Sequence, residues 1–184
     1  ENGEVLWSYN YFAAKEWKQT GLIWTNTPIW YKDEVYISKG YDFPSKMLKI
    51  SPDATSVSEK FTNEVLDNHH HGLVLVDGHV YASNWINNGK GNWVCMDWDT
   101  GEIKWETVWE NKGSIVYADG LLYIYEERRG NVGLVKPNPD KLEVISSFNI
   151  TEGSGPHWAH PFIGDGKLFI RHGDVLMVYN ISKK

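Results

Sequence analysis

Cysteine is almost absent from this chain of 184 residues, which contains only Cys95. A single cysteine cannot form an internal disulfide, so non-covalent packing has to hold the core together. No apolar run approaches the roughly 18 to 20 residues that a membrane-spanning helix needs. The first residues, ENGEVLWSYN, also lack the basic and then apolar pattern of a signal peptide. We therefore expect a soluble globular protein that is either cytoplasmic or lacks its leader.

Arginine is also scarce, at 3 of the 18 basic residues, and the formal net charge is −6. Nucleic acids are usually bound by a basic face, so this balance argues against nucleic acid as the main partner. Aromatic residues are plentiful, at 14% of the chain, and hydrophobic residues make up 41%. This composition allows one substantial core, and the length predicts a single domain.

Four stretches of the sequence share one pattern, in which two alternating runs flank a short turn. Each second run has an aromatic residue at the same place, and these residues are Tyr36, Tyr81, Tyr123 and Phe169. They follow one another at intervals of 45, 42 and 46 residues. Three of the turns are Asp-Gly, a pair that favours a tight hairpin, and the first is Lys32-Asp33. A period in the forties of short alternating runs predicts an all-β fold, a β-propeller of four-stranded antiparallel blades.

The repeats predict one domain over residues 1–184. Its parts are an outer strand at 1–10 and four blades at about 17–63, 64–110, 111–151 and 152–184. The last blade stops after its third strand, whereas NGEVLWSY near the start resembles TGEIKWET, the outer strand of the second blade. Either strands from both ends of the chain complete one blade, or the chain is a fragment of a larger ring with further blades. We expect either that residues 4–9 pair with residues 175–180 within one chain, or that two chains share the missing contacts.

The second blade contains the segment CMDWDTGEIKW. The spacing of a tryptophan-docking motif is present there at Asp97, Thr100, Gly101 and Trp105. On these residues the chain resembles the propellers built from pyrroloquinoline quinone (PQQ) repeats, although Cys95 stands where alanine is usual. That family includes quinoprotein alcohol dehydrogenases and the propeller lipoprotein of outer-membrane assembly. The resemblance implies a ring of eight blades, of which four repeats are half, and a periplasmic or other extracytoplasmic location.

Tryptophans on outer strands are expected to lie between neighbouring blades. There the large ring buries apolar surface that the polar edges of the blades do not provide. The candidates for this position are Trp7 and Trp105.

Histidine and arginine gather on one class of connection. One face of a propeller has the hairpins within blades, and the other has the loops between second and third strands together with the links between blades. Six of the seven histidines and all three arginines fall in or beside this second set. Such side chains suit an anionic or carbonyl-bearing ligand, or a metal. The predicted ligand-binding residues are His70, His71, Trp85, Arg128, His157, Trp158, His160, Arg171 and His172.

Three interpretations of these histidines remain open: hydrogen bonds to a neighbouring blade, contact with a ligand, or metal binding. No metal ligands are assigned, because the clusters HHH and HWAH have no matched third cluster with an acidic partner. If the ligand is an anion, we expect its affinity to rise as the pH falls through about 6.5, the ordinary pKa of histidine.

The sequence favours a non-catalytic propeller that binds a small anionic ligand, a glycan or another protein through this face. No catalytic residue is assigned. The alternative that the resemblance implies is a quinoprotein-type oxidoreductase with PQQ as its cofactor. Dehydrogenases of that family hold PQQ against adjacent disulfide-bonded cysteines, with calcium and a catalytic aspartate, and this chain cannot supply the cysteine pair. If PQQ binds, we expect Trp85 or Trp158 to stack on it and Arg128 or Arg171 to contact its carboxylates.

Overall fold

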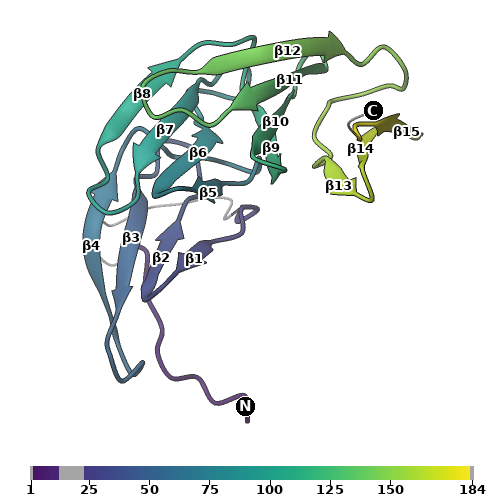
Figure 1. The fold of residues 1–184 in the computed structure, drawn as a ribbon. Helices are drawn as coiled ribbons and strands as arrows, with labels where there is room; N and C mark the ends of the chain where they lie inside the picture. The colour runs from purple at the N-terminus through teal and green to yellow at the C-terminus, as the bar shows by residue number, and fades with distance from the viewer. Residues whose placement is uncertain (1, 13–22, 183–184) are drawn as a thin grey trace.

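The computed structural model describes residues 2–12 and 23–182, and all of its regular elements are β-strands. They form three four-stranded antiparallel sheets and one three-stranded sheet. Figure 1 shows the four sheets following one another along an arc, with β4, β8 and β12 on its outer side. The predicted all-β fold is confirmed. Within the described residues, no helix is long and apolar enough to cross a membrane.

Each sheet is built from strands that are consecutive in the sequence. The first sheet consists of β1 (Ile29–Tyr31), β2 (Glu34–Ile37), β3 (Ser45–Ile50) and β4 (Val57–Asn63). The second consists of β5 (Val74–Val76), β6 (His79–Ser83), β7 (Trp93–Asp97) and β8 (Ile103–Thr107). The third consists of β9 (Gly113–Ala118), β10 (Leu121–Glu126), β11 (Asn131–Lys136) and β12 (Glu143–Asn149). The fourth consists of β13 (Phe162–Gly164), β14 (Lys167–His172) and β15 (Val175–Asn180).

Two-residue turns join the first and second strands of every sheet. In the Asp-Gly turns both residues have positive φ, for example 47° at Asp77 and 78° at Gly78. This geometry matches the twist of the flanking strands. The shared aromatic residue is the third residue of each second strand, and it pairs with Ile29, Val74, Val116 and Phe162 respectively. The prediction that these four aromatic residues are equivalent is therefore confirmed.

The core consists of three hydrophobic clusters, one between each pair of neighbouring sheets. The cluster between the second and third sheets contains Trp93, Cys95 and Ile124, all at most 2% exposed. Cys95 is a free thiol that fills this core. Trp105 on β8 packs against the same cluster, and its Nε1 donates at 2.8 Å to the backbone oxygen of Asn138, in the turn between β11 and β12 of the third sheet. It thus spans the boundary between two sheets.

The chain ends are not paired with each other. Residues 2–10 form no strand, and Tyr9 instead donates a hydrogen bond to Glu59 on β4. Figure 1 shows the N-terminus beyond the first sheet and the C-terminus beside the fourth, far apart. The pairing considered between residues 4–9 and 175–180 is therefore not formed within this chain. Trp7 is half-buried and belongs to no sheet.

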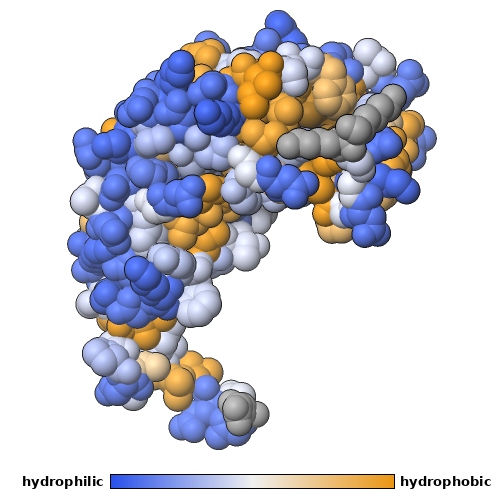
Figure 2. All heavy atoms as spheres, in the orientation of Figure 1, coloured by the Kyte–Doolittle hydropathy of each residue, from blue (hydrophilic) through white to orange (hydrophobic). Residues whose placement is uncertain are grey.

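The surface differs along the arc. Figure 2 shows mostly hydrophilic residues over the outer strands of the first sheet and a hydrophobic area near the third and fourth sheets. A cavity of about 760 Å³ lies between these two sheets, with Tyr123, Phe148 and Tyr179 among its lining residues. The rings of Phe148 and Tyr179 lie 5.0 Å apart across it. The last two sheets therefore pack less completely than a filled protein core would.

Candidate functional site

A pocket of about 500 Å³ opens where the links between sheets meet the loops that follow the second strands. We call it the histidine pocket. Its lining residues are Ile23, Thr25, Tyr41, His69, His70, Trp85, Asn88, Lys112, Glu127 and Trp158. All of them belong to the face on which histidine and arginine were expected to gather. Three of the predicted residues, His70, Trp85 and Trp158, therefore line one pocket.

The backbone of the histidine triplet is held from three other parts of the chain. Thr25 Oγ1 donates to the carbonyl oxygen of His69 at 3.2 Å, and the backbone N–H of Ile115 donates to that of His71, also at 3.2 Å. His160 Nε2 donates to the carbonyl oxygen of His70 at 2.6 Å. Because each carbonyl has its own donor, the backbone path of the triplet is fixed at all three residues. His160 itself is exposed and acts here on the backbone rather than on the pocket.

The loop before the triplet is fixed by an Asx turn. Asn63 Oδ1 accepts the backbone N–H groups of Val65 and Leu66 at 2.9 and 2.7 Å. Tyr36, the shared aromatic of the first sheet, then donates from its hydroxyl to the carbonyl oxygen of Leu66 at 3.0 Å. The repeat residue that defines the fold thus also anchors the segment that leads to the histidines.

One wall of the pocket is organised around Asp67. Its carboxylate accepts the backbone N–H of Trp85 at 3.0 Å and that of Asp42. The aromatic ring of Tyr41 lies 4.3 Å from that of His69 and 5.2 Å from that of Trp85. Burial raises the pKa of the Asp67 carboxyl to about 7. Asp67 therefore positions an aromatic wall without itself lining the pocket.

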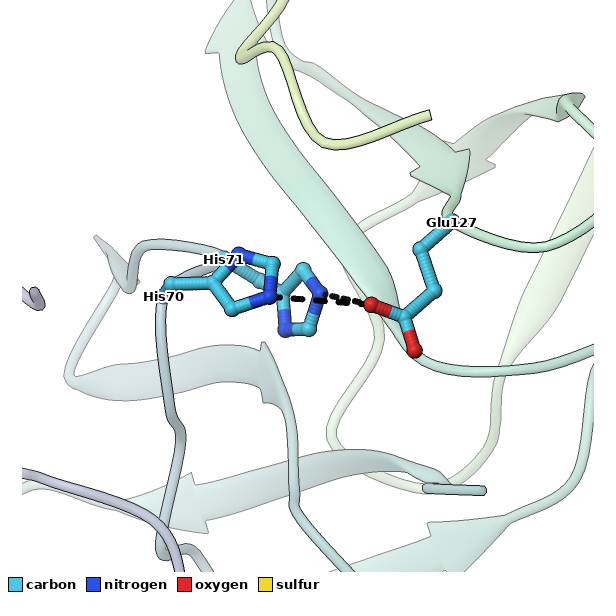
Figure 3. A group of neighbouring side chains, drawn as sticks. All are labelled: His70, His71 and Glu127. Atoms are coloured by element: carbon cyan, nitrogen blue, oxygen red, sulfur yellow. Dashed lines mark hydrogen bonds and ion pairs between the residues drawn. The ribbon is translucent and has the colours of Figure 1, made fainter. Parts of the chain in front are cut away.

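Next to this wall is a cluster of His70, His71 and Glu127, whose side chains converge in Figure 3. His71 is fully buried, and its Nε2 donates to Glu127 Oε2 at 2.9 Å. His70 Nε2 lies 3.7 Å from the same oxygen, and the two imidazole rings lie 3.9 Å apart. The three ligating atoms are within 4.8 Å of one another. The cluster joins the link before β5 to the residue that follows β10.

Lys112 holds the other side of Glu127. Its Nζ lies 3.3 Å from Glu127 Oε1 and also donates to the backbone oxygens of Asn87 and Lys90. The backbone N–H of Glu127 donates to the carbonyl oxygen of Lys112 at 3.0 Å. The carboxylate is therefore oriented by a buried cation on one oxygen and by imidazoles on the other.

The three histidines of the triplet are electrically neutral at neutral pH. Burial lowers the pKa of His69 and of His70 to about 4, and the neighbouring histidine rings act in the same direction. Burial also holds the pKa of His71 well below its ordinary value. The expectation that anion affinity rises through about pH 6.5 is therefore wrong for these side chains, because desolvation moves their protonation to far lower pH.

Two further predicted residues, His157 and His172, form a separate stacked pair. Their rings lie 3.7 Å apart at an angle of 20°. His172 lies 2.7 Å through Nδ1 from the carbonyl oxygen of Glu152 and 2.7 Å through Nε2 from that of Gly155. His157 hydrogen-bonds the hydroxyl of Tyr125 through Nδ1. Both imidazoles are buried and are used to fasten the segment before β13.

The two predicted arginines lie outside the histidine pocket. Arg128 lines a different cavity of about 310 Å³, together with Arg129 and Glu126. Arg171 is exposed, and its Nε donates to the carbonyl oxygen of Gly173 at 2.8 Å. The predicted set is thus divided among four places, and Arg128 and Arg171 do not join the aromatic wall.

Sequence reasoning missed Tyr41, Asp67, Lys112 and Glu127. Each lies in a loop or link of the same face, so sorting all polar and aromatic residues by connection type would have selected them. What the sequence does not indicate is that Glu127, 56 positions after His71, approaches it across a sheet boundary. The acidic partner that was sought near the histidines comes from the next sheet.

No family model matches the chain, and no curated protein matches it. Among solved structures it is similar to the computationally designed Ika8 protein, with a TM-score of 0.59 and 12% identity over 85% of this chain and 45% of that one. It is also similar to a europium-containing methanol dehydrogenase, with a TM-score of 0.51 and 12% identity over 68% of this chain and 24% of that one. That dehydrogenase is a β-propeller. The fold of this chain is a β-propeller.

The similarity extends to BamB from Moraxella catarrhalis, at a TM-score of 0.47 and 16% identity over 96% of this chain and 63% of that one. The chain therefore spans less than two thirds of the length of each of these structures. The two similarities with TM-scores above 0.5 support the blade architecture, and at 12% identity they carry nothing about ligands.

The residues of the histidine pocket do not fit PQQ in the manner that the family resemblance implies. Cys95 is buried in the core between the second and third sheets, and it is the only cysteine of the chain. Arg128 and Arg171, which were expected to contact the quinone carboxylates, are elsewhere. The pocket offers Trp85 and Trp158 as apolar surfaces. Among its described lining residues Lys112 is the only lysine or arginine, and Glu127 already pairs with it.

Proposed function

We propose that this propeller is a binding module and that its ligand-binding site is the histidine pocket. The observation that carries the proposal is the joint presence of aromatic walls and unpaired polar atoms. Tyr41, Trp85 and Trp158 supply the aromatic walls. Trp85 Nε1 and His69 Nε2 are buried without a hydrogen-bond partner in the described residues. Buried polar atoms usually have partners, so these two atoms favour a ligand that supplies them.

The chemistry of the pocket favours a small ring-shaped ligand with an apolar face and a hydrogen-bonding edge, and a sugar is the class that combines both. Trp158 is 56% exposed at the mouth of the pocket, where a ring stacks without displacing other side chains. The histidines are neutral, and Lys112 is paired with Glu127. The pocket therefore provides no free positive charge among its described residues that would favour a strongly anionic ligand.

The test is a binding screen by saturation-transfer NMR with a panel of monosaccharides and disaccharides, and with aromatic carboxylates as the competing class. Trp85→Ala and Trp158→Ala are expected to weaken binding on the order of tenfold or more, because stacked aromatic residues dominate such sites. Trp30→Ala is the matched control, since Trp30 is 68% exposed on β1 and does not line the pocket. Binding that survives both pocket substitutions would contradict the proposal.

Membership of the PQQ-repeat family and an extracytoplasmic location are supported only by the docking-motif residues and by the position of Trp105 between two sheets. Both remain proposals. Fractionation of the native host, with detection of the chain in the periplasmic or secreted fraction, tests the location. Recovery in the cytoplasmic fraction alone would contradict it.

A further inference from the structure

We propose that His70, His71 and Glu127 form a binding site for a divalent transition-metal ion, with zinc as the reference ion, at the wall of the histidine pocket. Two imidazole nitrogens and one carboxylate oxygen are a donor set that suits zinc and its neighbours in the first transition series. The three donors of a tetrahedral site with bonds of about 2.0 to 2.1 Å lie about 3.3 to 3.4 Å apart.

The observed geometry is close to that requirement. Glu127 Oε2 lies 2.9 Å from His71 Nε2 and 3.7 Å from His70 Nε2. These two distances bracket the separation expected between donors, and all three donor atoms lie within 4.8 Å of one another. Side-chain rotation that adjusts these separations places an ion among them. Figure 3 shows both rings directed at the same carboxylate oxygen.

The groups around the cluster hold the donors in place, as the neighbours of metal ligands commonly do. Lys112 is 3.3 Å from Glu127 Oε1 and leaves Oε2 directed at the histidines. The carbonyl oxygens of His70 and His71 are each bound from another part of the chain, by His160 and by Ile115. The site thus joins the second and third sheets through elements that packing already fixes.

Three protein donors leave a fourth position free for a ligand. His70 and Glu127 both line the pocket, whereas His71 lies beneath them. The free position therefore faces the space enclosed by Tyr41, Trp85 and Trp158, where a ligand oxygen can complete the coordination. Only this role of the fourth position rests on the proposed function; metal binding itself does not.

The test uses the full chain, stripped with a chelator and titrated with Zn²⁺ alone by calorimetry at pH 7.5, with Co²⁺ as a spectroscopic probe of the donor set. We expect one Zn²⁺ per chain. His70→Ala and Glu127→Gln are expected to weaken zinc binding on the order of 100-fold each, since each removes a ligand. Two matched controls are expected to bind zinc as the parent does: His79→Ala on the opposite face, and Glu102→Gln, whose side chain is 66% exposed and remote from the site.

Circular dichroism of each variant establishes that it is folded. If Glu127→Gln fails to fold, His70→Ala decides the test, because the His70 side chain is 19% exposed and lies at the pocket wall. Absence of zinc binding by the parent, or an unchanged affinity in either ligand variant that folds, would overturn the site. Zinc binding that depends on His70 and Glu127, together with sugar binding that is indifferent to Trp85 and Trp158, would refute the proposed function alone.

Discussion

At the scale of single residues, Asp67 supports the histidine pocket without lining it. It is 3% exposed, and its carboxyl accepts backbone N–H groups from two loops that carry aromatic walls. Burying a carboxylate without a paired cation is unfavourable, so the folded protein favours the protonated form. The same residue thus orders Tyr41 and Trp85 and makes the stability of the fold depend on pH.

The first prediction concerns this dependence. The pKa of Asp67 is raised from 3.8 to about 7. Between these values the folded state holds a proton that the unfolded chain lacks, so this residue lowers the free energy of unfolding as the pH rises. Asp67→Asn removes that contribution. We expect the variant to gain stability relative to the parent between pH 4 and 7, by at most about 1.4 kcal/mol per pH unit.

The measurement is urea unfolding of both proteins with chelator present, at several pH values between 4.5 and 7.5. The difference between the two curves isolates Asp67, because every other titrating group is common to both. A difference that does not change with pH would show that the Asp67 carboxyl titrates alike in the folded and unfolded states.

Trp105 is the second residue whose effect can be predicted. Its ring contributes to the core between the second and third sheets, and its Nε1 donates to the carbonyl oxygen of Asn138. Trp105→Ala is expected to lower the free energy of unfolding by about 3 to 5 kcal/mol. Trp30→Ala, at an exposed site, is expected to change it by less than about 0.5 kcal/mol. Equal effects of the two substitutions in urea unfolding would contradict the role of Trp105 between sheets.

At the scale of elements, the turns of this protein differ in what surrounds them. Gly130 is the last residue of the loop between β10 and β11 and has a φ of +75°. A Cβ at this position would lie 2.4 Å from the ring of His157. Gly120, in the turn between β9 and β10, has a similar φ of +80° but nothing within 4 Å. At Gly120 a side chain would meet only the cost of a positive φ, whereas at Gly130 it would meet that cost and a clash with His157.

This contrast gives the third prediction. Gly120→Ala is expected to lower the free energy of unfolding by about 1 to 2 kcal/mol, the cost of a left-handed backbone for alanine. Gly130→Ala is expected to cost about 1 to 3 kcal/mol more, because His157 has to move and the segment before β13 with it. Thermal unfolding of the two variants compares them directly. Equal destabilisation would mean that His157 yields without loss.

At the scale of the whole molecule, the arc presents an edge strand. Among the described residues β15 is the last strand of its sheet, paired with β14 and with no strand on its other side. Two apolar side chains of β15, Leu176 and Val178, are 60% and 50% exposed. Open strand edges with apolar side chains tend to pair with other chains. The prediction that two copies share contacts follows from this edge.

We therefore expect the chain to self-associate as its concentration rises, and Val178→Lys to reduce that association because lysine at a strand edge disfavours pairing. Analytical ultracentrifugation over a concentration series measures both. Val108→Lys, at a position that is 72% exposed beyond the end of β8, is the control and is expected to associate as the parent does. A parent that remains monomeric throughout the series would contradict the prediction.

The sequence by itself determined the architecture of this protein. The period of Tyr36, Tyr81, Tyr123 and Phe169 and the Asp-Gly turns depend on backbone geometry within one blade, where the interacting residues are close in the chain. The sorting of loops by face also needs no coordinates, since strand order sets it. For this reason His70, Trp85 and Trp158 could be selected together from sequence.

Only the tertiary structure decided what those residues contact and which charge they have. Glu127 meets His71 because packing of the second and third sheets brings their connections together, and no local pattern encodes that distance. The same packing desolvates His69 and His70 and moves their pKa values to about 4, against the ordinary value that the sequence suggests. Arg128 and Arg171 share the face yet lie outside the pocket, because connection type specifies the side of the propeller and not the direction of a long side chain.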